Sequence, residues 1–142
     1  MTTILIDTDV ILDFFFDREP FSKNAAKILS LCESKEIKGY VTPVIISNVY
    51  YLLRKRAKHE KVINELRNLL SIIHVSVINK NIIFQALNSS FKDFEDALQN
   101  YSAESNPEIA VIITRNTKDY KYSSLSVLTP ENYIKTIINL KI

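Results

Sequence analysis

The side chains best suited to chemistry in this chain of 142 residues are polar ones that follow apolar segments. Asp7 directly follows the apolar run at residues 3–6, and the segment Thr114–Asp119 follows a second such run. Asp96 and Asn48 lie in the early turns of expected helices. Carboxylates that a fold brings together repel one another, and a bound cation relieves the repulsion. Mg²⁺ or Mn²⁺ is the expected ion, because hard divalent cations prefer oxygen ligands.

Several of these carboxylates also have a purely structural explanation. Asp93 and Asp96 have the spacing of a helix N-cap and the third helical residue, so they can pair with free backbone N–H groups. A chemical role is favoured for Asp7, because a carboxylate between an apolar strand and an apolar helix is partly desolvated. Asp119 can be a simple loop carboxylate. Three further aspartates are expected at helix ends or on the surface: Asp9, Asp13 and Asp17.

Strand and helix patterns alternate along the chain that must position these side chains. Short apolar or alternating runs predict strands at residues 3–6, 40–41, 74–78, 109–113 and 126–128. Helical spacing predicts helices at residues 10–16, 22–33, 43–55, 59–70, 79–87, from 93 onward and 131–140. Thr42-Pro43 and Thr129-Pro130 each predict an N-cap followed by a proline in the first turn. Gly39 is expected to allow the turn into the second strand.

This alternation predicts an α/β fold, a three-layer α/β/α sandwich around a mostly parallel sheet of about five strands. In such sheets reactive groups gather beyond the carboxyl ends of the strands. Asp7, Asn48, Asp96 and the segment 114–119 are therefore expected to meet at one edge. The length, with 46% apolar and 24% charged residues, fits a single domain over residues 1–142.

The composition excludes several other classes of protein. No apolar run approaches the roughly 20 residues needed to cross a bilayer, and no basic leader precedes the first strand, so a soluble cytoplasmic protein is expected. Cys32 is the single cysteine, so no internal disulfide can form. With only His59 and His74 beside it, a closed zinc site is not expected.

Positive charge is concentrated in two runs, although the net charge is only +2. The denser run consists of Arg54, Lys55, Arg56, Lys58, His59 and Lys61. Its simplest interpretation is a solvated helix face. The sparser run, Arg115, Lys118 and Lys121, lies beside the expected acidic site and is the better candidate for binding phosphate, because phosphate affinity depends on where the charges lie.

Four stretches together resemble the PIN-domain family, the nuclease fold of VapC-type toxins, over nearly the whole chain. They are ILIDTDVILD at the start, FKDFEDALQ, VIITRNTKDY and the closing SVLTPENYI. The resemblance implies that Asp7 and Asp96 are metal-site acids and that Asn116 or Asp119 lies near the fourth acidic position. In TPVIISNVYYLL the chain has Asn48 where many relatives have glutamate. An amide brings no charge and cannot act as a base near neutral pH.

The resemblance implies hydrolysis of RNA phosphodiesters, with Asp7 and Asp96 holding Mg²⁺ or Mn²⁺. Asn48 and Asp119 would orient water or the ligands. Thr114 and Asn116 would line the site, and Arg115 or Lys118 would bind phosphates of the substrate. The family also implies an antitoxin protein as partner and a homodimer. An endonuclease must also reach an unpaired strand, which nearby tyrosines such as Tyr50, Tyr51 or Tyr120 could face.

Two alternatives remain open at this point. Because Asn48 thins the acidic set, the chain could be a catalytically weakened module that binds RNA or a protein. The sequence hydrophobic-Asp-Thr-Asp-Val also resembles the first motif of haloacid-dehalogenase-like phosphatases, which would give Asp9 a catalytic role. That family expects an acidic pair after a late strand, where this chain has Thr114-Arg115-Asn116.

Overall fold

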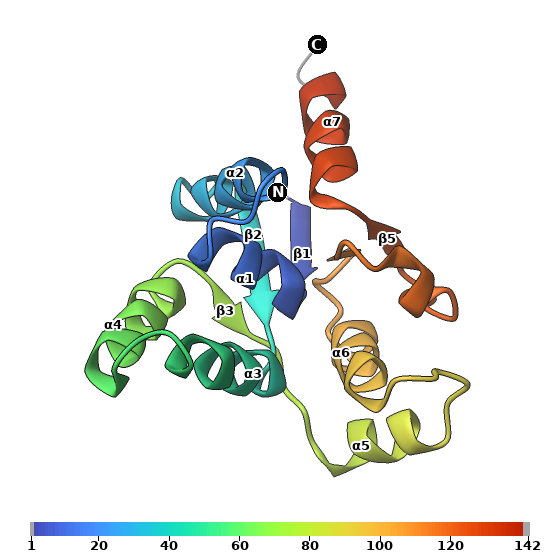
Figure 1. Cartoon of the computed structure of the whole chain (residues 1–142). Helices are drawn as coiled ribbons and strands as arrows, with labels where there is room; N and C mark the ends of the chain where they lie inside the picture. The colour runs from blue at the N-terminus through green and yellow to red at the C-terminus, as the bar shows by residue number, and fades with distance from the viewer. Residues whose placement is uncertain (1, 141–142) are drawn as a thin grey trace.

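The computed structural model describes residues 2–140, in which five short strands form one parallel sheet (Figure 1). The strands are β1 (Thr2–Ile6), β2 (Ile37–Val41), β3 (His74–Val75), β4 (Val111–Ile113) and β5 (Ser126–Leu128). Their order across the sheet is β3-β2-β1-β4-β5. The chain builds outward from β1 in one direction and then in the other, so the strand order reverses between β1 and β4. Ligands of open parallel sheets bind beyond the carboxyl ends of the strands at such a reversal.

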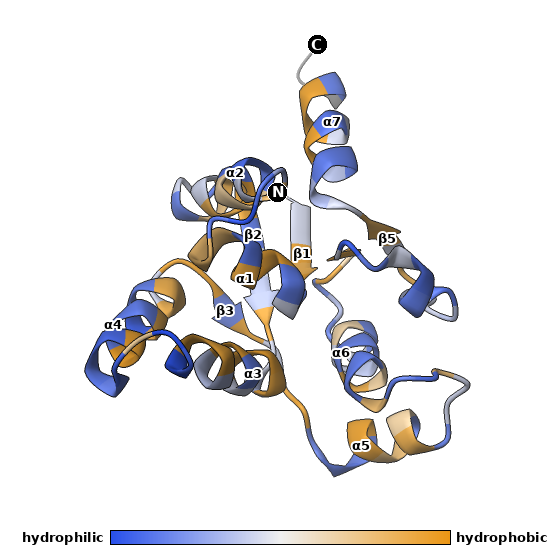
Figure 2. Ribbon diagram, in the orientation of Figure 1, coloured by the Kyte–Doolittle hydropathy of each residue, from blue (hydrophilic) through white to orange (hydrophobic). Residues whose placement is uncertain are grey.

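Helices cover both faces of this sheet. They are α1 (Thr8–Phe15), α2 (Ser22–Glu33), α3 (Pro43–Arg54), α4 (His59–Leu70), α5 (Lys80–Leu87), α6 (Phe94–Ser105), α7 (Pro130–Leu140) and the short 3₁₀ helix η1 (Thr117–Tyr120). In Figure 2 hydrophobic and hydrophilic residues alternate around the helices, as expected for helices with one face against a core. Within residues 2–140 no helix is both long enough and apolar enough to span a membrane.

The side chains of β1 show why the fold has three layers. Ile4 and Ile6 belong to a core shared with α1, α2, α3, α4 and α7, whereas Leu5 belongs to a second core with Ala103 of α6 and Tyr120 of η1. Successive residues of a strand point to opposite faces, so β1 is buried on both sides. The predicted three-layer α/β/α sandwich with a parallel sheet of five strands is confirmed.

The predicted helix starts at threonine and aspartate are also confirmed. Thr42 Oγ1 accepts the backbone N–H of Ile45 at 3.1 Å, and Asp93 Oδ1 accepts that of Asp96 at 2.9 Å. Such caps each contribute about 1 kcal/mol to helix stability. Thr42 Oγ1 also donates a hydrogen bond to Gln99 Oε1, which ties the start of α3 to α6. The helices that carry Asn48 and Asp96 are thereby fixed to each other beside the sheet edge.

Two expectations about the strands are wrong. Gly39 does not form a turn, since it lies within β2 with no positive φ, and the left-handed residue before this strand is Lys35, at φ 64°. Gly39 is required instead by packing, because a Cβ at this position would lie 2.7 Å from Cys32 Sγ. The third strand ends at Val75 rather than at residue 78, and the carbonyl of Val77 accepts a hydrogen bond from Ser102 Oγ at 2.7 Å instead of joining the sheet.

Candidate active site at the carboxyl edge of the sheet

An open pocket of about 490 Å³ lies where the sequence placed the reactive groups. Its lining includes Asp7, Asp9, Asn48, Asp96 and Asn116, together with Thr8, Leu12, Arg18, Tyr51, Leu52, Glu95 and Gln99. Four of the predicted site residues, Asp7, Asn48, Asp96 and Asn116, thus come together although they are far apart in the sequence. The others, Thr114, Arg115, Lys118 and Asp119, do not line this pocket.

Asp7 is held by both β1 and β4. Its backbone N–H donates to the carbonyl of Ile113 at 3.0 Å, which continues the pairing of the two strands. Its carboxylate caps α1 by accepting the N–H of Thr8 at 2.8 Å and accepts the hydroxyl of Thr114 at 3.0 Å. Burial raises the pKa of Asp7 from 3.8 to about 6, and the charge of nearby Asp9 adds to the rise. Thr114 therefore holds the Asp7 carboxylate in place through a hydrogen bond without itself lining the pocket.

Asp96 reaches the same pocket from the first turn of α6. Burial is the largest cause that raises its pKa from 3.8 to about 7, and repulsion from Asp7, Asp93 and Asp119 adds to the rise. Asp7 and Asp96 therefore lie close enough in this pocket for their charges to repel each other, as the sequence predicted. A cation bound between them would remove this repulsion.

Tyr120 connects the two carboxylates, a role that the sequence did not reveal. Its hydroxyl donates a long hydrogen bond of 3.5 Å to Asp96 Oδ1 and also lies beside Asp7, whose pKa it lowers. The phenol is buried, and burial with the two nearby negative charges raises the pKa of Tyr120 far above its ordinary value. It therefore stays a neutral donor. The sequence suggested Tyr120 only as a ring that could face an unpaired strand, and the structure buries it instead.

Asp9 lies in the first turn of α1, one of the positions expected for it, and it also lines the pocket. Its Oδ2 accepts the backbone N–H of Arg115 at 2.9 Å and the hydroxyl of Thr114 at 3.4 Å, so it fixes the loop after β4. Its Oδ1 is buried and has no hydrogen-bond partner among residues 2–140. Burial raises the pKa of Asp9, and the N–H of Arg115 opposes that rise.

Asp13 was also expected at a helix end or on the surface; it lies in the last turn of α1, and it is buried in an ion-pair cluster. Arg115 donates two hydrogen bonds to its carboxylate, from Nε to Oδ2 at 2.6 Å and from Nη2 to Oδ1 at 3.0 Å. Arg18 Nη1 lies 3.5 Å from Asp13 Oδ1. The Arg115 guanidinium also lies 4.1 Å from the ring centroid of Phe21. Arg115 was predicted to bind phosphate, and the structure places its guanidinium in these contacts, outside the pocket. The cation that lines the pocket is Arg18.

Asn48 lies where the sequence suggested, and it contacts a carboxylate that the sequence analysis did not single out. Its Nδ2 donates to Glu95 Oε2 at 3.0 Å, and both residues line the pocket. Glu95 precedes Asp96 on α6, so the position of Asp96 next to a second acid was the signal that could have indicated it. The negative charge that Asn48 lacks is supplied at this wall by α6.

Lys118 and Asp119 lie in a neighbouring pocket of about 340 Å³, which is also lined by Lys92, Asp93, Lys121 and Tyr122. Asp119 is exposed there, and it is close enough to raise the pKa of Asp96. It thus influences the site through its charge and not as part of the pocket wall.

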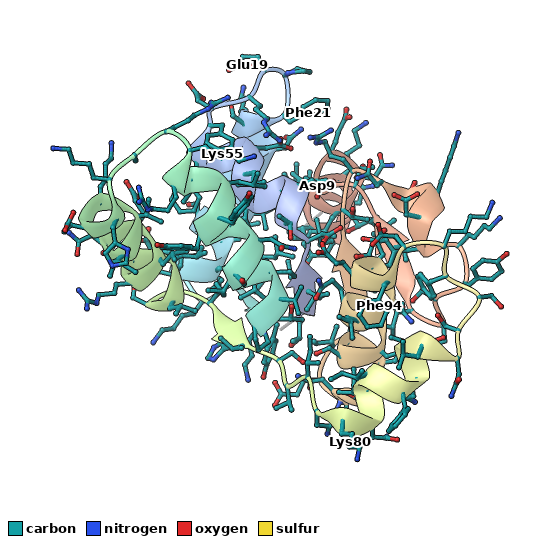
Figure 3. The ribbon with its side chains drawn as sticks, turned by 60° about the horizontal axis from the view of Figure 1, so that its bottom comes forward. Asp9, Glu19, Phe21, Lys55, Lys80 and Phe94 are labelled. Atoms are coloured by element: carbon teal, nitrogen blue, oxygen red, sulfur yellow. The ribbon has the colours of Figure 1, made fainter. Side chains whose placement is uncertain are left out.

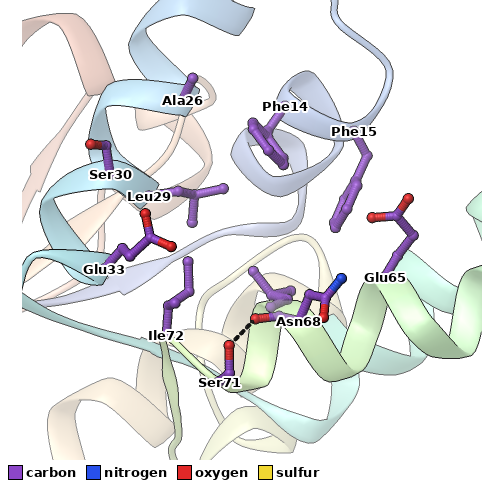
Figure 4. Close-up of a pocket in the computed structure, with 11 residues that line it drawn as sticks. Phe14, Phe15, Ala26, Leu29, Ser30, Glu33, Glu65, Asn68, Ser71 and Ile72 are labelled. Atoms are coloured by element: carbon purple, nitrogen blue, oxygen red, sulfur yellow. Dashed lines mark hydrogen bonds between the residues drawn. The ribbon is translucent and has the colours of Figure 1, made fainter.

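A larger cavity of about 570 Å³ between α1, α2 and α4 contains no such set of groups (Figure 4). Its walls are mainly apolar, and Glu33 and Glu65 are the two acids that line it. The hydrogen bond drawn there joins Ser71 Oγ to the carbonyl of Asn68 at 2.6 Å. We therefore take the smaller pocket as the candidate site, because chemistry requires converging groups more than volume.

The donor set fits a hard divalent ion held by few protein ligands. Among residues 2–140 no three side chains of His, Cys, Asp or Glu are arranged to enclose a metal. Asp7 and Asp96 offer carboxylate oxygens with raised pKa values, and Asp9 Oδ1 is an unpartnered buried acceptor nearby. Mg²⁺ is commonly bound by one or two carboxylates, with water and phosphate oxygens in the other positions. Two acids therefore suffice for this fit.

Comparison with known proteins decides the family. The description of the PIN domain matches residues 3–118, which is most of the chain. This chain belongs to the PIN-domain family. It therefore does not belong to the haloacid dehalogenases considered as an alternative. No match to a curated protein was found.

Solved structures with the PIN-like fold extend over most of this chain. A toxin–antitoxin complex from Klebsiella pneumoniae has 24% identity and a TM-score of 0.67, covering 89% of this chain and 97% of that chain. VapBC-1 from nontypeable Haemophilus influenzae has 17% identity and a TM-score of 0.67, covering 92% and 99%. VapC20 from Mycobacterium tuberculosis, a toxin that cleaves the sarcin-ricin loop, has 16% identity and a TM-score of 0.58, covering 77% and 86%. At these identities the likeness concerns the fold.

Proposed function

We propose that this PIN-domain protein is a Mg²⁺- or Mn²⁺-dependent endoribonuclease and the toxin of a toxin–antitoxin pair. The observation that carries the proposal is the meeting of Asp7 and Asp96 in one pocket, with pKa values raised to about 6 and about 7. Two desolvated carboxylates that repel one another destabilise the fold, and a cation bound between them relieves this repulsion. Such groups with raised pKa values are typical of functional sites. The structural likeness to toxins of toxin–antitoxin complexes supports the biological role.

Asp7 and Asp96 would hold the cation. When bound, such an ion polarises a phosphate and makes an adjacent water more acidic. Tyr120 and Thr114 hold the two carboxylates in place through the hydrogen bonds described above. Asn48, which lines the pocket beside Glu95, would orient water.

The remaining predicted roles follow the positions of the side chains. Asn116 lines the pocket and can contact substrate, whereas Arg18 replaces Arg115 as the cation nearest to a bound phosphate. Lys118 would contact substrate only beyond the pocket, in the neighbouring cavity that Asp119 shares.

Cleavage of a labelled single-stranded RNA by the purified protein tests this proposal. We expect cutting with Mg²⁺ or Mn²⁺, none in EDTA, and loss of cutting in Asp7→Asn and Asp96→Asn. Asp17→Asn is the matched control: Asp17 is exposed with φ 51°, a conformation that asparagine adopts readily. Cutting that persists in EDTA, or in either site variant, would contradict the assignment.

A second candidate function is RNA or protein binding without cutting, and Asn48 is the observation that favours it. The amide occupies a wall of the pocket without charge, which would weaken catalysis. If the wild-type protein binds RNA but cuts with neither ion, this candidate replaces the first.

The partners and the location stay predictions from the family. They are an antitoxin protein, a second copy of the chain in a homodimer, and a cytoplasmic setting. Co-purification with the product of a neighbouring small gene would test the first, and the solution mass would test the second.

A further inference from the structure

A basic–aromatic strip, made of Phe16, Arg18, Tyr51, Lys55 and Arg56, begins at the rim of the carboxylate pocket, which Arg18 and Tyr51 line, and continues to Phe16 and Arg56, which line another pocket. We propose that this strip binds single-stranded RNA beside the pocket, with a base stacked on Tyr51 and phosphates on the three cations. The proposal deepens the ribonuclease function and rests on it for the fate of the bound strand.

The first observation is that cations and rings are interleaved along this strip. Arg18 and Arg56 both lie over the ring of Phe16, with Cζ 5.1 Å and 4.2 Å from its centroid. Lys55 Nζ lies 5.1 Å from the ring centroid of Tyr51. Proteins that hold unpaired strands combine a positive track for the backbone with aromatic faces for the bases. The strip offers both.

The second observation is that the strip is continuous with the active site. Tyr51 and Arg18 line the same pocket as Asp7 and Asp96, and Tyr51 is 65% exposed. Figure 3 shows Lys55 at the end of α3 on the side of the molecule where Asp9 is labelled. A base stacked on Tyr51 would therefore place the adjacent phosphate at the mouth of the pocket.

The third observation is the distribution of charge. The pocket is lined by Asp7, Asp9, Glu95 and Asp96, which repel a phosphate, so a positive rim is needed to bring one in. Among residues 2–140 Lys55 and Arg56 make no ion pair, and Arg18 is shared with Asp13 at 3.5 Å. Their charge is available at the rim although the chain as a whole has a net charge of only +2.

The cavity that several lysines line is less suited to this role. The cavity with Lys92, Lys118 and Lys121 also contains Asp93 and Asp119, which offset much of its positive charge. Lys55 and Arg56, which are exposed and make no ion pair among residues 2–140, lie with the exposed ring of Tyr51 on the α3 side. An acidic protein could also bind cations, but it would gain little from the ring of Tyr51, so the two occupants differ in a measurable way.

Binding of a short fluorescent oligouridylate, measured by anisotropy in EDTA so that no cutting occurs, tests the strip. Tyr51→Ala should weaken binding about tenfold, and Tyr51→Phe should bind like the wild type because it keeps the ring. Lys55→Gln and Arg56→Gln should each lower the slope of log affinity against log salt concentration by about 0.7. The duplex of this strand with its oligoadenylate complement should bind less tightly, because its bases are already paired and stacked.

The chain provides a matched control on α5. Lys80 lies over Phe84 at 5.8 Å, with the same spacing of four residues as Tyr51 and Lys55, and Phe84 is also exposed. Lys80 lies at the opposite end of the molecule from Lys55 in Figure 3. Phe84→Ala and Lys80→Gln should leave RNA binding unchanged, and melting curves of all variants confirm that they fold.

Two results would overturn the strip: unchanged binding in Tyr51→Ala, or equal competition by polyglutamate, which would indicate a surface for an acidic protein. Cutting assays on the same proteins separate this proposal from the ribonuclease. A wild type that cuts RNA while the strip variants bind and cut normally refutes the strip alone. A wild type that binds through Tyr51 but never cuts refutes the ribonuclease alone.

Discussion

Replacing the buried acid Asp7 with asparagine should stabilise the metal-free protein at neutral and higher pH. A carboxyl group whose pKa is higher in the folded chain than in the unfolded chain favours folding while it is protonated. The contribution of Asp7 is therefore fully present below pH 3.8 and is lost as the pH rises through about 6. Asparagine stays neutral at every pH, so it avoids this loss.

The size of the effect follows from the pKa and the contacts of Asp7. A rise from 3.8 to about 6 corresponds to about 3 kcal/mol, because a tenfold change in acidity is worth about 1.4 kcal/mol. Asparagine can still accept from Thr8, but its amide nitrogen faces the hydroxyl of Thr114, which can turn toward Asp9. Disturbing this hydrogen bond costs about 1 kcal/mol. The expected net gain is about 2 kcal/mol, or roughly 6 °C in melting temperature.

Thermal unfolding followed by circular dichroism measures this gain. In EDTA at about pH 8 the Asp7→Asn protein should melt above the wild type, and below about pH 4 it should melt slightly below the wild type, because only the cost of the disturbed hydrogen bond remains there. Mg²⁺ or Mn²⁺ should then stabilise the wild type more than the variant, because the ion binds the folded state through Asp7. Asp17→Asn, at an exposed turn, should follow the wild type throughout.

Two outcomes would refute this reasoning. One is a variant that melts at or below the wild-type temperature at about pH 8 in EDTA. The other is a difference that stays constant across the titration, which would show that Asp7 is not desolvated and repelled as the structure indicates.

Two further predictions concern the scaffold. Gly39→Ala should lower the free energy of unfolding by about 1–3 kcal/mol in urea titrations, because its Cβ would lie 2.7 Å from Cys32 Sγ, and adding Cys32→Ala should recover part of the loss. Equal losses in the single and double variants would show that this contact is not the cause. Asp13→Ala should cost about 3 kcal/mol by leaving Arg115 without its buried partner, whereas an effect as small as that of Asp17→Asn would contradict the ion-pair cluster.

The sequence by itself determined the architecture and the sheet edge at which the candidate site lies. The apolar run of β1, with Asp7 at its end, fixes a strand buried on both faces, and local hydrogen bonds at Thr42 and Asp93 fix where α3 and α6 begin. These features depend on the periodicity and capping of neighbouring residues, which can be seen directly in a sequence. The edge at which Asp7 and Asp96 meet follows from the parallel alternation of strands and helices.

Only the tertiary structure decided which side chains pair across that edge. Arg115 forms an ion pair with Asp13, which lies 102 residues earlier in the chain, and Tyr120 lies between the carboxylate of Asp7, which caps α1, and that of Asp96 on α6. Gly39 is required by a sulfur atom on a helix and not by a turn. Which side chains become partners depends on their distance and orientation after the layers have packed. A sequence pattern shows the periodicity of a helix or strand, but it does not show which residue of another element will face it.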